Sequence, residues 1–430
     1  MTEGNKMLWQ TMSDYAQDRT LCENLFAALR NESFDGVGIT REAFSEKETR
    51  IMEIVEAEAQ KLGLTTGWDE GRNLYVTLEG RQPDLPFIAI GSHLDSVLQG
   101  GNFDGAAGVL AGLAILAGFK RDGLKPACDI RMYALRGEES SRFGKAYMGS
   151  SSLMGCLSSS DLALKDATGQ TMEACMKSVG MPVEKIRAGE LLQDPKQMAV
   201  WIELHIEQGP ILIAAQQPAG VVSGIRGNIR HKKIECIGEA AHSGATPKEL
   251  RHDAIFATAD LFMRIDRLWD DYLKNDKDLV VTSGVFGTDP KEHAIARIPG
   301  WVGFSFDARS QDTETLEEFY QAFQTECQKI EKERGVTFRF DRRIDTAPAV
   351  LDPKWIKRLQ NAASQCGVSD KLVPSGAGHD AAVFSNAGIP SVMVFVRNEN
   401  GSHNPHEAME IDDFLAGVAM IRLAVREAVQ

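Results

Sequence analysis

The apolar positions in residues 15–62 recur at helical spacing, apart from one interruption around Ser33–Phe44. In the later part of this stretch, Ile51, Val55 and Leu62 fall on one side of a helix. Recurrence at steps of three and four residues is the pattern of an amphipathic helix. The sequence therefore predicts helices over residues 15–62, joined by one loop.

After residue 62, short apolar runs alternate with helical stretches. The runs predict strands, and the longer apolar or amphipathic stretches predict helices; the strands are expected at Phe87–Gly91, Asp129–Leu135, Val200–His205 and Ser391–Val396, and the helices at Gly105–Phe119 and Asp412–Val429. Strands that alternate with helices are typical of an α/β domain with a mainly parallel central sheet.

The segment 222–335 has a different order of elements. It predicts a strand, a long helix, two strands and a second long helix, at IRHKKIECIG (229–238), Asp253–Leu273, LVVTSGVF (279–286), GWVGFSFDAR (300–309) and Thr313–Arg334. This β-α-β-β-α order suits a small α+β sandwich with an antiparallel sheet. We therefore expect residues 222–335 to form a domain inserted into an α/β domain made of residues 1–221 and 336–430.

Length and charge narrow the class of protein. With 430 residues, the chain is long enough for two domains. Its 47 Lys and Arg against 61 Asp and Glu give a formal net charge of −14, which argues against non-specific nucleic-acid binding, because that requires a basic face. No run of about 18 apolar residues occurs, so no membrane span is predicted.

The seven cysteines are scattered and form no CxxC pair, and the N-terminal segment has no basic region followed by an apolar run. Scattered cysteines without a pairing motif indicate reduced thiols, and such an N-terminus is not a secretory signal. The expected location is the cytoplasm.

Four predicted strands are each followed by side chains that bind metals well. These side chains are His93 and Asp95, with Asp104 in the next loop; Glu138 and Glu139; His205 and Glu207; and His403. In a parallel sheet, strand ends of one polarity meet at the same edge, where such sheets bind ligands. Any one of these histidines could be an ordinary structural residue, and adjacent acids are common on surfaces. Their joint placement at four strand ends indicates a metal site.

The residue types at these strand ends favour a dinuclear site. Three imidazoles and two carboxylates, one of them bridging, suffice for two ions such as Zn²⁺ or Mn²⁺ when no thiolate is offered. Two such ions polarise a scissile carbonyl and lower the pKa of a bridging water, and a further carboxylate must then carry the proton to the leaving nitrogen. Adjacent Glu138 and Glu139 suit this division of roles. Asp95 lies two residues after His93, where it could accept the other imidazole N–H.

Several segments resemble the M20 metallopeptidase/amidase family, and within it the hydantoinase/carbamoylase branch. The matching segments run from Gly38 to the C-terminal helix: GITREAFS (38–45), GSHLDSVLQGGNFDGAAGV (91–109), EESSRFG (138–144), ELHIEQGPIL (203–212), AAHSGATP with RHDA (240–254), SGAGHDA (375–381) and GSHNPHE (401–407). HIEQGP and SGAGHDA separate this branch from ordinary M20 peptidases. The branch includes N-carbamoyl-L-amino-acid hydrolases, allantoate amidohydrolases and β-ureidopropionases.

The resemblance implies a role for each matched position. The implied metal ligands, for two divalent ions per subunit (Zn, Mn, Co or Ni), are His93, Asp104 as the bridge, Glu139, His205 and His403. Glu138 matches the general base, and Asp95 the acid that supports the ligands. His242 matches a histidine of the smaller domain that reaches the partner subunit's active site and stabilises the oxyanion, which implies a homodimer. The implied substrate contacts are Gln208, Arg230, Arg309 and the loop Gly376, Ala377, Gly378 and His379.

The chain departs from the branch's pattern in the region that contacts the substrate. Ala296 stands where the family usually has an Asn, Arg226 where it has an uncharged residue, and Asn228 where it has a Gln. Arg297 is a further unusual residue. We expect the reaction class to be kept and the substrate to be altered; Arg226, Asn228 and Arg297 are candidate contacts to an additional acidic group, although either arginine could instead pair with a surface acid.

Three functions compete at this point. The leading one is hydrolysis of an N-carbamoyl or ureido compound that carries a carboxylate, giving an amine, ammonia and CO₂; allantoate hydrolysis is a variant of it. The second is hydrolysis of an ordinary amide, as in an N-acyl-amino-acid hydrolase or a dipeptidase, with the same metal site. The third is a non-catalytic binding protein that keeps the fold, which loss of Glu138 or of a metal ligand would support, and none is lost.

Overall fold

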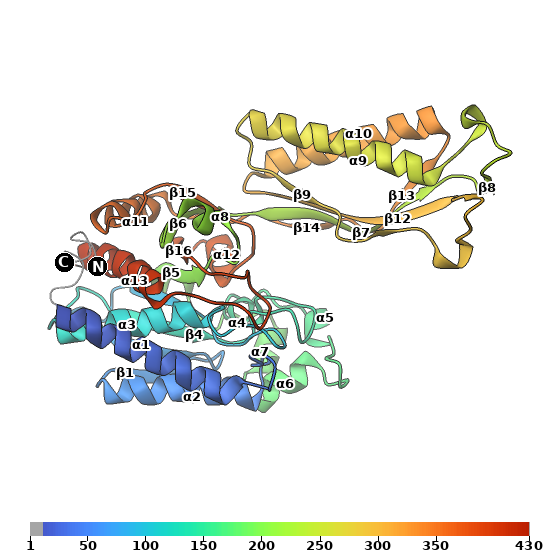
Figure 1. Ribbon diagram of the computed structural model, residues 1–430. Coiled ribbons are helices and arrows are strands. Elements are labelled where there is room, and N and C mark those ends of the chain that lie inside the picture. Colours follow the sequence, from blue (N-terminus) through green and yellow to red (C-terminus); the bar gives the residue numbers. More distant parts are fainter. Residues whose placement is uncertain (1–11, 430) are drawn as a thin grey trace. The chain divides into compact units, whose positions relative to one another are not determined.

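A computed structural model describes residues 12–429 of the chain. The chain divides into two compact units: residues up to Ser223 together with those from Val350 onward, and Gly224–Ala349. Within the second of these units, Figure 1 shows a yellow and an orange helix lying on a sheet. The order of the two units along the chain matches the expected insertion.

The first unit is built on an eight-stranded sheet in the order β1-β2-β4-β3-β5-β16-β6-β15. Its strands are β1 (Thr65–Trp68), β2 (Leu74–Leu78), β3 (Phe87–His93), β4 (Ile130–Leu135), β5 (Met198–Ile206), β6 (Ala219–Ile225), β15 (Leu372–Ser375) and β16 (Ser391–Val396). The central strands β4, β3, β5 and β16 pair in parallel, whereas β1, β2 and β6 pair antiparallel. The prediction of an α/β fold is confirmed, with the parallel part limited to the centre of a mixed sheet.

Helices cover both faces of this sheet. They are α1 (Met12–Ser33), α2 (Glu46–Lys61), α3 (Ala106–Arg121), α4 (Met148–Leu153), α5 (Ser159–Leu162), α6 (Met172–Ser178), α7 (Val183–Arg187), α8 (Ile211–Ala215), α11 (Pro353–Gln365), α12 (Asp380–Asn386) and α13 (Ile411–Val429). Side chains alternate between the faces of a strand. Ile202 and Val394 therefore join α3 and α13 in the main core, while Trp201 packs on Phe384 of α12 with ring centroids 4.4 Å apart.

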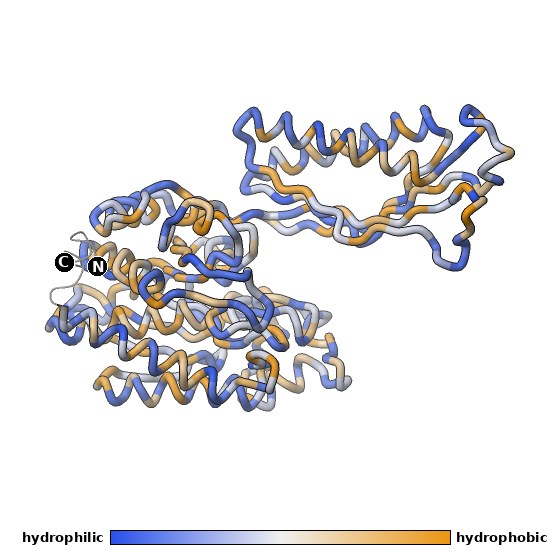
Figure 2. Tube along the Cα trace, viewed as in Figure 1, coloured by the Kyte–Doolittle hydropathy of each residue, from blue (hydrophilic) through white to orange (hydrophobic). Residues whose placement is uncertain are grey.

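Glycines let helix α3 approach the sheet closely. A Cβ at Gly108 would lie 2.3 Å from the carbonyl oxygen of Leu204 in β5, so only glycine allows this contact. Figure 2 shows orange hydrophobic stretches within the first unit, and α3 is apolar and buried from Ala106 to Phe119 before it ends in Lys120 and Arg121. Its N-terminus is thereby fixed beside the ends of β3 and β5.

The second unit is an antiparallel sheet with two long helices. Its elements are β7 (Gly227–Ile237), β8 (Ala241–His242), α9 (Ala254–Lys274), β9 (Val280–Thr282), β10 (Phe286–Gly287), β11 (Arg297–Ile298), β12 (Trp301–Ser310), α10 (Thr313–Arg334), β13 (Thr337–Phe340) and β14 (Ile344–Thr346). Strands β7 and β12 form its centre, and every pairing in the six-stranded sheet is antiparallel. The two helices pack on this sheet through their apolar sides.

Two details of the second unit differ from the expectation. The unit extends to Ala349 rather than to residue 335, because β13 and β14 both pair with β7. The expected strand over 279–286 is split into β9 and β10, which pair with separate parts of β12.

Within residues 12–429, no helix combines the length and the hydrophobicity that a membrane-spanning helix needs.

Candidate metal centre and active site

The five expected metal ligands lie at or just after strand ends of the first unit. His93 is the last residue of β3, and His205 the penultimate residue of β5. Asp104 lies in the turn before α3, Glu139 follows β4, and His403 follows β16. The strands deliver these side chains to one edge of the parallel centre, where they form overlapping groups of close ligand atoms.

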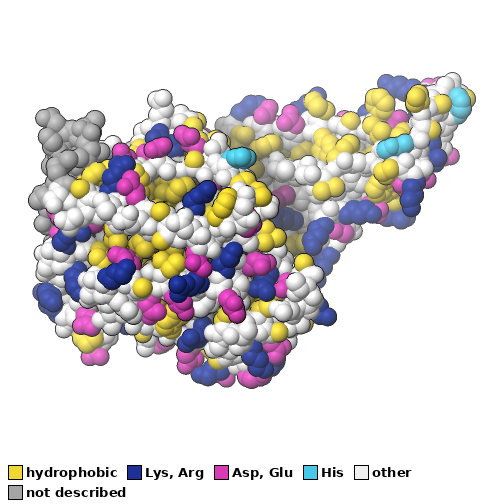
Figure 3. Space-filling model, turned by 60° about the horizontal axis from the view of Figure 1, so that its bottom comes forward, with side chains coloured by type: hydrophobic (Ala, Val, Ile, Leu, Met, Phe, Trp, Pro, Cys, Tyr) yellow, Lys and Arg dark blue, Asp and Glu magenta, His cyan; other side chains and the backbone are white. Residues whose placement is uncertain are grey.

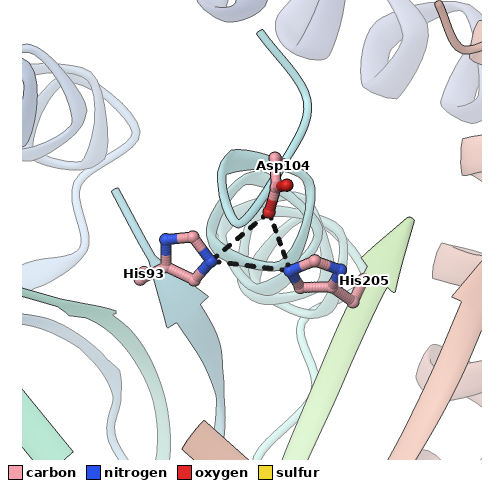
Figure 4. A group of neighbouring side chains, drawn as sticks. All are labelled: His93, Asp104 and His205. Atoms are coloured by element: carbon pink, nitrogen blue, oxygen red, sulfur yellow. Dashed lines mark hydrogen bonds and ion pairs between the residues drawn. The ribbon is translucent and has the colours of Figure 1, made fainter. Parts of the chain in front are cut away.

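The first group consists of His93, Asp104 and His205, whose ligand atoms face one another in Figure 4. Oδ1 of Asp104 lies 3.5 Å from Nε2 of His93 and 3.2 Å from Nε2 of His205. The two Nε2 atoms are 3.5 Å apart. All three residues are buried, so a small cation between them would be shielded from water.

The second group uses the other oxygen of the same aspartate. Oδ2 of Asp104 lies 3.4 Å from Nε2 of His403, and that nitrogen is 3.5 Å from Oε1 of Glu139. Asp104 therefore presents one oxygen to each group, which is the arrangement a bridging carboxylate requires. Three imidazoles and two carboxylates without a thiolate fit borderline divalent ions such as Zn²⁺ or Mn²⁺.

Glu138 lies beside the first group. Its Oε2 is 3.8 Å from Nε2 of His93, and its carboxylate forms a third group of close ligand atoms with His93 and Glu139. Burial, reinforced by Glu139, raises the pKa of Glu138 well above its usual range. A buried carboxyl with a raised pKa next to a ligand cluster is suited to accept and return a proton.

Asp95 holds the neighbouring side chains in place. Its two carboxylate oxygens accept the backbone N–H groups of Glu138 and Glu139, at 2.9 and 3.0 Å. Its Oδ1 is 3.4 Å from Nδ1 of His93, while its backbone carbonyl lies closer to that nitrogen, at 3.1 Å. The carboxylate thus fixes the backbone of both glutamates. Because the Asp95 carbonyl accepts the proton on Nδ1 of His93, Nε2 of the neutral ring carries no proton and can bind a metal ion.

Asp104 itself is held by several donors. Burial alone would raise the pKa of Asp104, but hydrogen bonds from His205, His403 and His93 outweigh it and hold this pKa well below its usual range. Nε2 of Gln208 donates to Oδ2 at 2.8 Å, which places this expected substrate contact at the cluster. Gln208 and His403 both have a φ of 61°, a left-handed conformation that is rare outside glycine, so the fold enforces their positions.

Two further residues at this site were missed by the sequence analysis. Glu407 accepts the backbone N–H groups of Phe103 and Asp104 at 2.8 and 3.2 Å, and Ser402 Oγ lies 2.5 Å from Asp104 Oδ2 and 2.8 Å from Glu407 Oε2. Both residues lie in the matched GSHNPHE segment, and this match was the only signal in the sequence that could have pointed to them.

Glu207, proposed as a possible ligand, instead accepts the N–H groups of Ile211 and Leu212 at the start of α8.

The loop Gly376–His379 lies next to His205. The rings of His379 and His205 are 4.4 Å apart, and Nε2 of His379 is 3.1 Å from Oγ of Ser375. Burial, with the nearby His205, lowers the pKa of His379 well below its usual value. The carbonyl of Ala377 accepts from Ser375 at 2.6 Å. A Cβ at Gly378 would lie 1.8 Å from the hydroxyl of Tyr147, so the loop requires glycine at this point.

The remaining candidate residues belong to the second unit. Each of the four candidate arginines pairs with an acid of the same unit. The pairs are Arg226 with Asp278 (2.5 Å), Arg230 and Arg309 with Asp307 (3.0 and 2.9 Å), and Arg297 with Glu292 (3.0 Å). The Arg226 side chain is only 13% exposed, and Asp278 also accepts the N–H of Gln311. Arg226 and Arg297 therefore each pair with an acid of the protein, which was the alternative to a contact with the substrate.

Arg230, Asn228 and Arg309 lie together on the central strands of the second unit. Arg230 is opposite Asp307, and Asn228 is opposite Arg309, in the register of β7 and β12. Asn228 is buried, and its side-chain oxygen has no hydrogen-bond partner within residues 12–429. His242 is exposed at the end of β8, and its Nδ1 accepts the N–H groups of Gly244 and Ala245. The proton of the neutral His242 ring is therefore on Nε2.

Fold and site together define an α/β protein with a candidate His/carboxylate metal site of the kind that hydrolases use. Residues 89–427 match the family model for Peptidase family M20/M25/M40, and the chain belongs to this family. The expected resemblance to its hydantoinase/carbamoylase branch is confirmed by a crystal structure of an amidase of that branch from Burkholderia multivorans. The TM-score is 0.86 at 27% identity, over 96% of this chain and 98% of that one.

Two curated relatives are similar over nearly their whole length. The N-carbamoyl-L-amino acid amidohydrolase of Geobacillus stearothermophilus is 32% identical over 91% of this chain and 94% of its own. The allantoate amidohydrolase of Escherichia coli (strain K12) is 30% identical over 90% of this chain and 92% of its own. Family and relatives confirm the prediction of an enzyme, a hydrolase of carbon–nitrogen bonds other than peptide bonds.

Replacing Asp95 tests its double role. An asparagine offers one acceptor oxygen, and its NH₂ group would face a backbone N–H of Glu138 or Glu139. We expect Asp95→Asn to weaken Zn²⁺ binding about 10- to 100-fold in a chelator-competition titration. Asp84→Asn, at an exposed position, is the matched control and should bind Zn²⁺ like the wild type. Equal affinities in both variants would contradict the role of Asp95.

Proposed function

We propose that this enzyme hydrolyses the carbon–nitrogen bond of an N-carbamoyl (ureido) amino acid or a related small carboxylated amide, using two divalent metal ions (Zn, Mn, Co or Ni) per subunit. The observation that carries the proposal is the position of Asp104 between the two ligand groups, with Glu138 beside them. A pair of divalent ions supplies Lewis acidity, which polarises a carbonyl and lowers the pKa of a nearby water.

The protein's own groups perform the proton transfers. Glu138 takes the proton from the attacking water and delivers it to the leaving nitrogen, for which its buried carboxyl with a raised pKa is suited. Its backbone N–H is held by Asp95, so the carboxyl stays beside His93. Burial of these side chains excludes bulk water from the reacting atoms.

Arg230 and Arg309 are the proposed contacts to the substrate's carboxylate. Both guanidinium groups bind the carboxylate of Asp307, which holds the two arginines side by side. A guanidinium group can bind a carboxylate through two parallel hydrogen bonds, whereas a lysine ammonium group cannot. Asn228 lies opposite Arg309, and its side-chain oxygen could accept a hydrogen bond from the substrate's amide.

His242 is the proposed oxyanion stabiliser, acting in the partner subunit of a homodimer. Because Nδ1 accepts two backbone N–H groups, Nε2–H is available as a donor to a developing negative charge. The second unit also exposes large apolar side chains that a partner could cover, at Leu250, Phe256, Val285, Phe286 and Ile295. Figure 3 shows such hydrophobic side chains among charged ones on its surface.

A substrate panel tests the reaction. The purified chain is loaded separately with Zn²⁺, Mn²⁺, Co²⁺ or Ni²⁺ and offered N-carbamoyl, N-formyl and N-acetyl amino acids, N-carbamoyl-β-alanine and allantoate, with release of amine or ammonia as the readout. We expect turnover of N-carbamoyl compounds and none without metal. Preference for allantoate would favour the activity that the Escherichia coli relative's name gives, and turnover of acyl compounds alone would refute the carbamoyl proposal.

The role of Glu138 predicts a loss of rate without a loss of metal. Glu138→Gln keeps the shape of the side chain and removes its basicity, so kcat should fall at least about 100-fold. Its metal content, measured by elemental analysis, should equal that of the wild type. Glu139→Gln is the contrasting variant, which should lose metal as well as activity. Wild-type turnover by Glu138→Gln would refute the mechanism.

The role of His242 across subunits predicts complementation between inactive variants. His242→Ala and Glu138→Gln, each inactive alone, are unfolded, mixed and refolded together. A mixed dimer then contains one site with its own Glu138 and an intact His242 from the partner, so random pairing restores about a quarter of the wild-type rate. If His242 acted within its own subunit, the mixture would stay inactive.

A further inference from the structure

The side chain of Arg41 is a buried cation whose guanidinium group has no hydrogen-bond partner among residues 12–429. It lies in the loop between α1 and α2, and its side chain is fully buried. None of its three guanidinium nitrogens has a hydrogen-bond partner among the residues that the structure describes. A guanidinium carries five N–H donors and stays charged at neutral pH. Such a charge is retained in a protein interior only where opposite charges surround it.

The backbone around Arg41 is fixed against the loop that carries the metal-binding acids. Arg41 donates its N–H to Ser96 Oγ at 3.0 Å and accepts the Ser96 N–H at 2.9 Å, one residue after Asp95. Ile39 exchanges two backbone hydrogen bonds with Gly100. The next residue, Gly101, packs on Glu407, whose Oε1 would lie 2.1 Å from a Cβ at that position.

The opposite charges that act most strongly on Arg41 are those of acids at the metal cluster. Burial lowers the pKa of the Arg41 guanidinium to about 10, and the carboxylates that oppose this effect are, in order, Glu407, Asp104, Asp95 and Glu139. All four acids are buried. Arg41 is therefore the counter-charge of acids that bind or support the metal site.

These acids crowd one another when no cation is bound. Asp104 and Glu407 approach the same hydroxyl, that of Ser402, which has one proton and can donate to only one of them at a time. These acids thus lie close together in a buried place, and a fixed cation nearby stabilises their charged forms.

We propose that Arg41 is a charge-compensating positioning residue, whose guanidinium stabilises the acids Asp104, Glu139, Asp95 and Glu407 in the metal-free protein and weakens their hold on divalent ions. The inference rests on the proposed function in one respect, that this cluster binds such ions. Because Arg41 and a bound ion repel each other and share the same acids, each reduces the stabilisation that the other provides.

The test compares thermal unfolding of the full-length protein, freed of metal with a chelator, with and without added Zn²⁺. Arg41→Met is expected to lower the unfolding temperature of the metal-free protein and to show a larger rise on Zn²⁺ addition than the wild type. Its Zn²⁺ dissociation constant, measured against a chromophoric chelator, is expected to fall at least tenfold. A residue needed only for packing would lower both unfolding temperatures equally.

Arg422→Met is the matched control. Arg422 is also a buried arginine, but it pairs with Asp18 and with the carbonyl of Ala114, and the side chains that act on it most strongly are Asp18, Arg121 and Asp122. This variant is expected to lose stability to the same extent with and without Zn²⁺. Arg41→Lys, which keeps the charge, is expected to show the wild-type rise on Zn²⁺ addition.

A double variant separates charge from packing, even if Arg41→Met fails to fold without metal. Glu407→Gln keeps an oxygen for the N–H groups of Phe103 and Asp104 and adds an NH₂ that can donate to Ser402. Combined with Arg41→Met it removes one charge of each sign. We expect the double variant to fold without metal and to regain the wild-type rise with Zn²⁺, which a lost packing contact would not allow.

Two results would overturn the inference while leaving the metal site intact: an equal Zn²⁺ effect in Arg41→Met and the wild type, or a double variant no better than Arg41→Met. A wild-type protein that Zn²⁺, Mn²⁺, Co²⁺ and Ni²⁺ all fail to stabilise would be a different outcome. That result would remove the proposed metal site itself, and the inference with it.

Discussion

The shared carboxylate of Asp104 is the interaction on which the rest of the site depends. One oxygen faces His93 and His205, and the other faces His403. Holding a carboxylate in this orientation requires the turn before α3 to be fixed, and the sequence does so with glycine. A Cβ at Gly105 would lie 2.4 Å from the ring of His93, so the turn can come this close to β3 only without a side chain. The close approach of α3 to the sheet at Gly108 then anchors the turn from the other side.

Around this carboxylate the fold gathers acids with two different tasks. Asp104 and Glu139 present oxygens to the ligand groups, whereas Asp95 and Glu407 use theirs to bind backbone N–H groups. The backbone N–H groups stabilise part of the charge of such a buried carboxylate, and the carboxylate fixes the chain segment that carries the ligands. The ligands are therefore positioned in advance, at the cost of concentrating negative charge in one buried place.

The two units divide the proposed work. The metal ligands and Glu138 belong to the first unit, and His242 with the arginine pair around Asp307 belongs to the second. The resemblance to the family implied that the metal ligands and Glu138, all in the first unit, are retained, whereas the expected departures at Arg226, Asn228 and Ala296 lie in the second. Such a division lets the reaction stay constant while the substrate changes, because chemistry and recognition are supported by separate cores.

The sequence by itself determined the local elements and the identities of the candidate ligands. Helix α10 spans Thr313–Arg334 as the pattern predicts, because periodicity and an N-terminal capping Asp312 are local signals. The ends of the parallel strands were enough to expect His93, His205 and Asp104 to converge. The tertiary structure alone decided what depends on distant pairing: strands β13 and β14 joining β7, Arg226 binding Asp278, and Glu407 holding Asp104 across some three hundred residues. Hydrogen bonds and charges act through space, so a one-dimensional pattern carries no record of which partners the fold brings together.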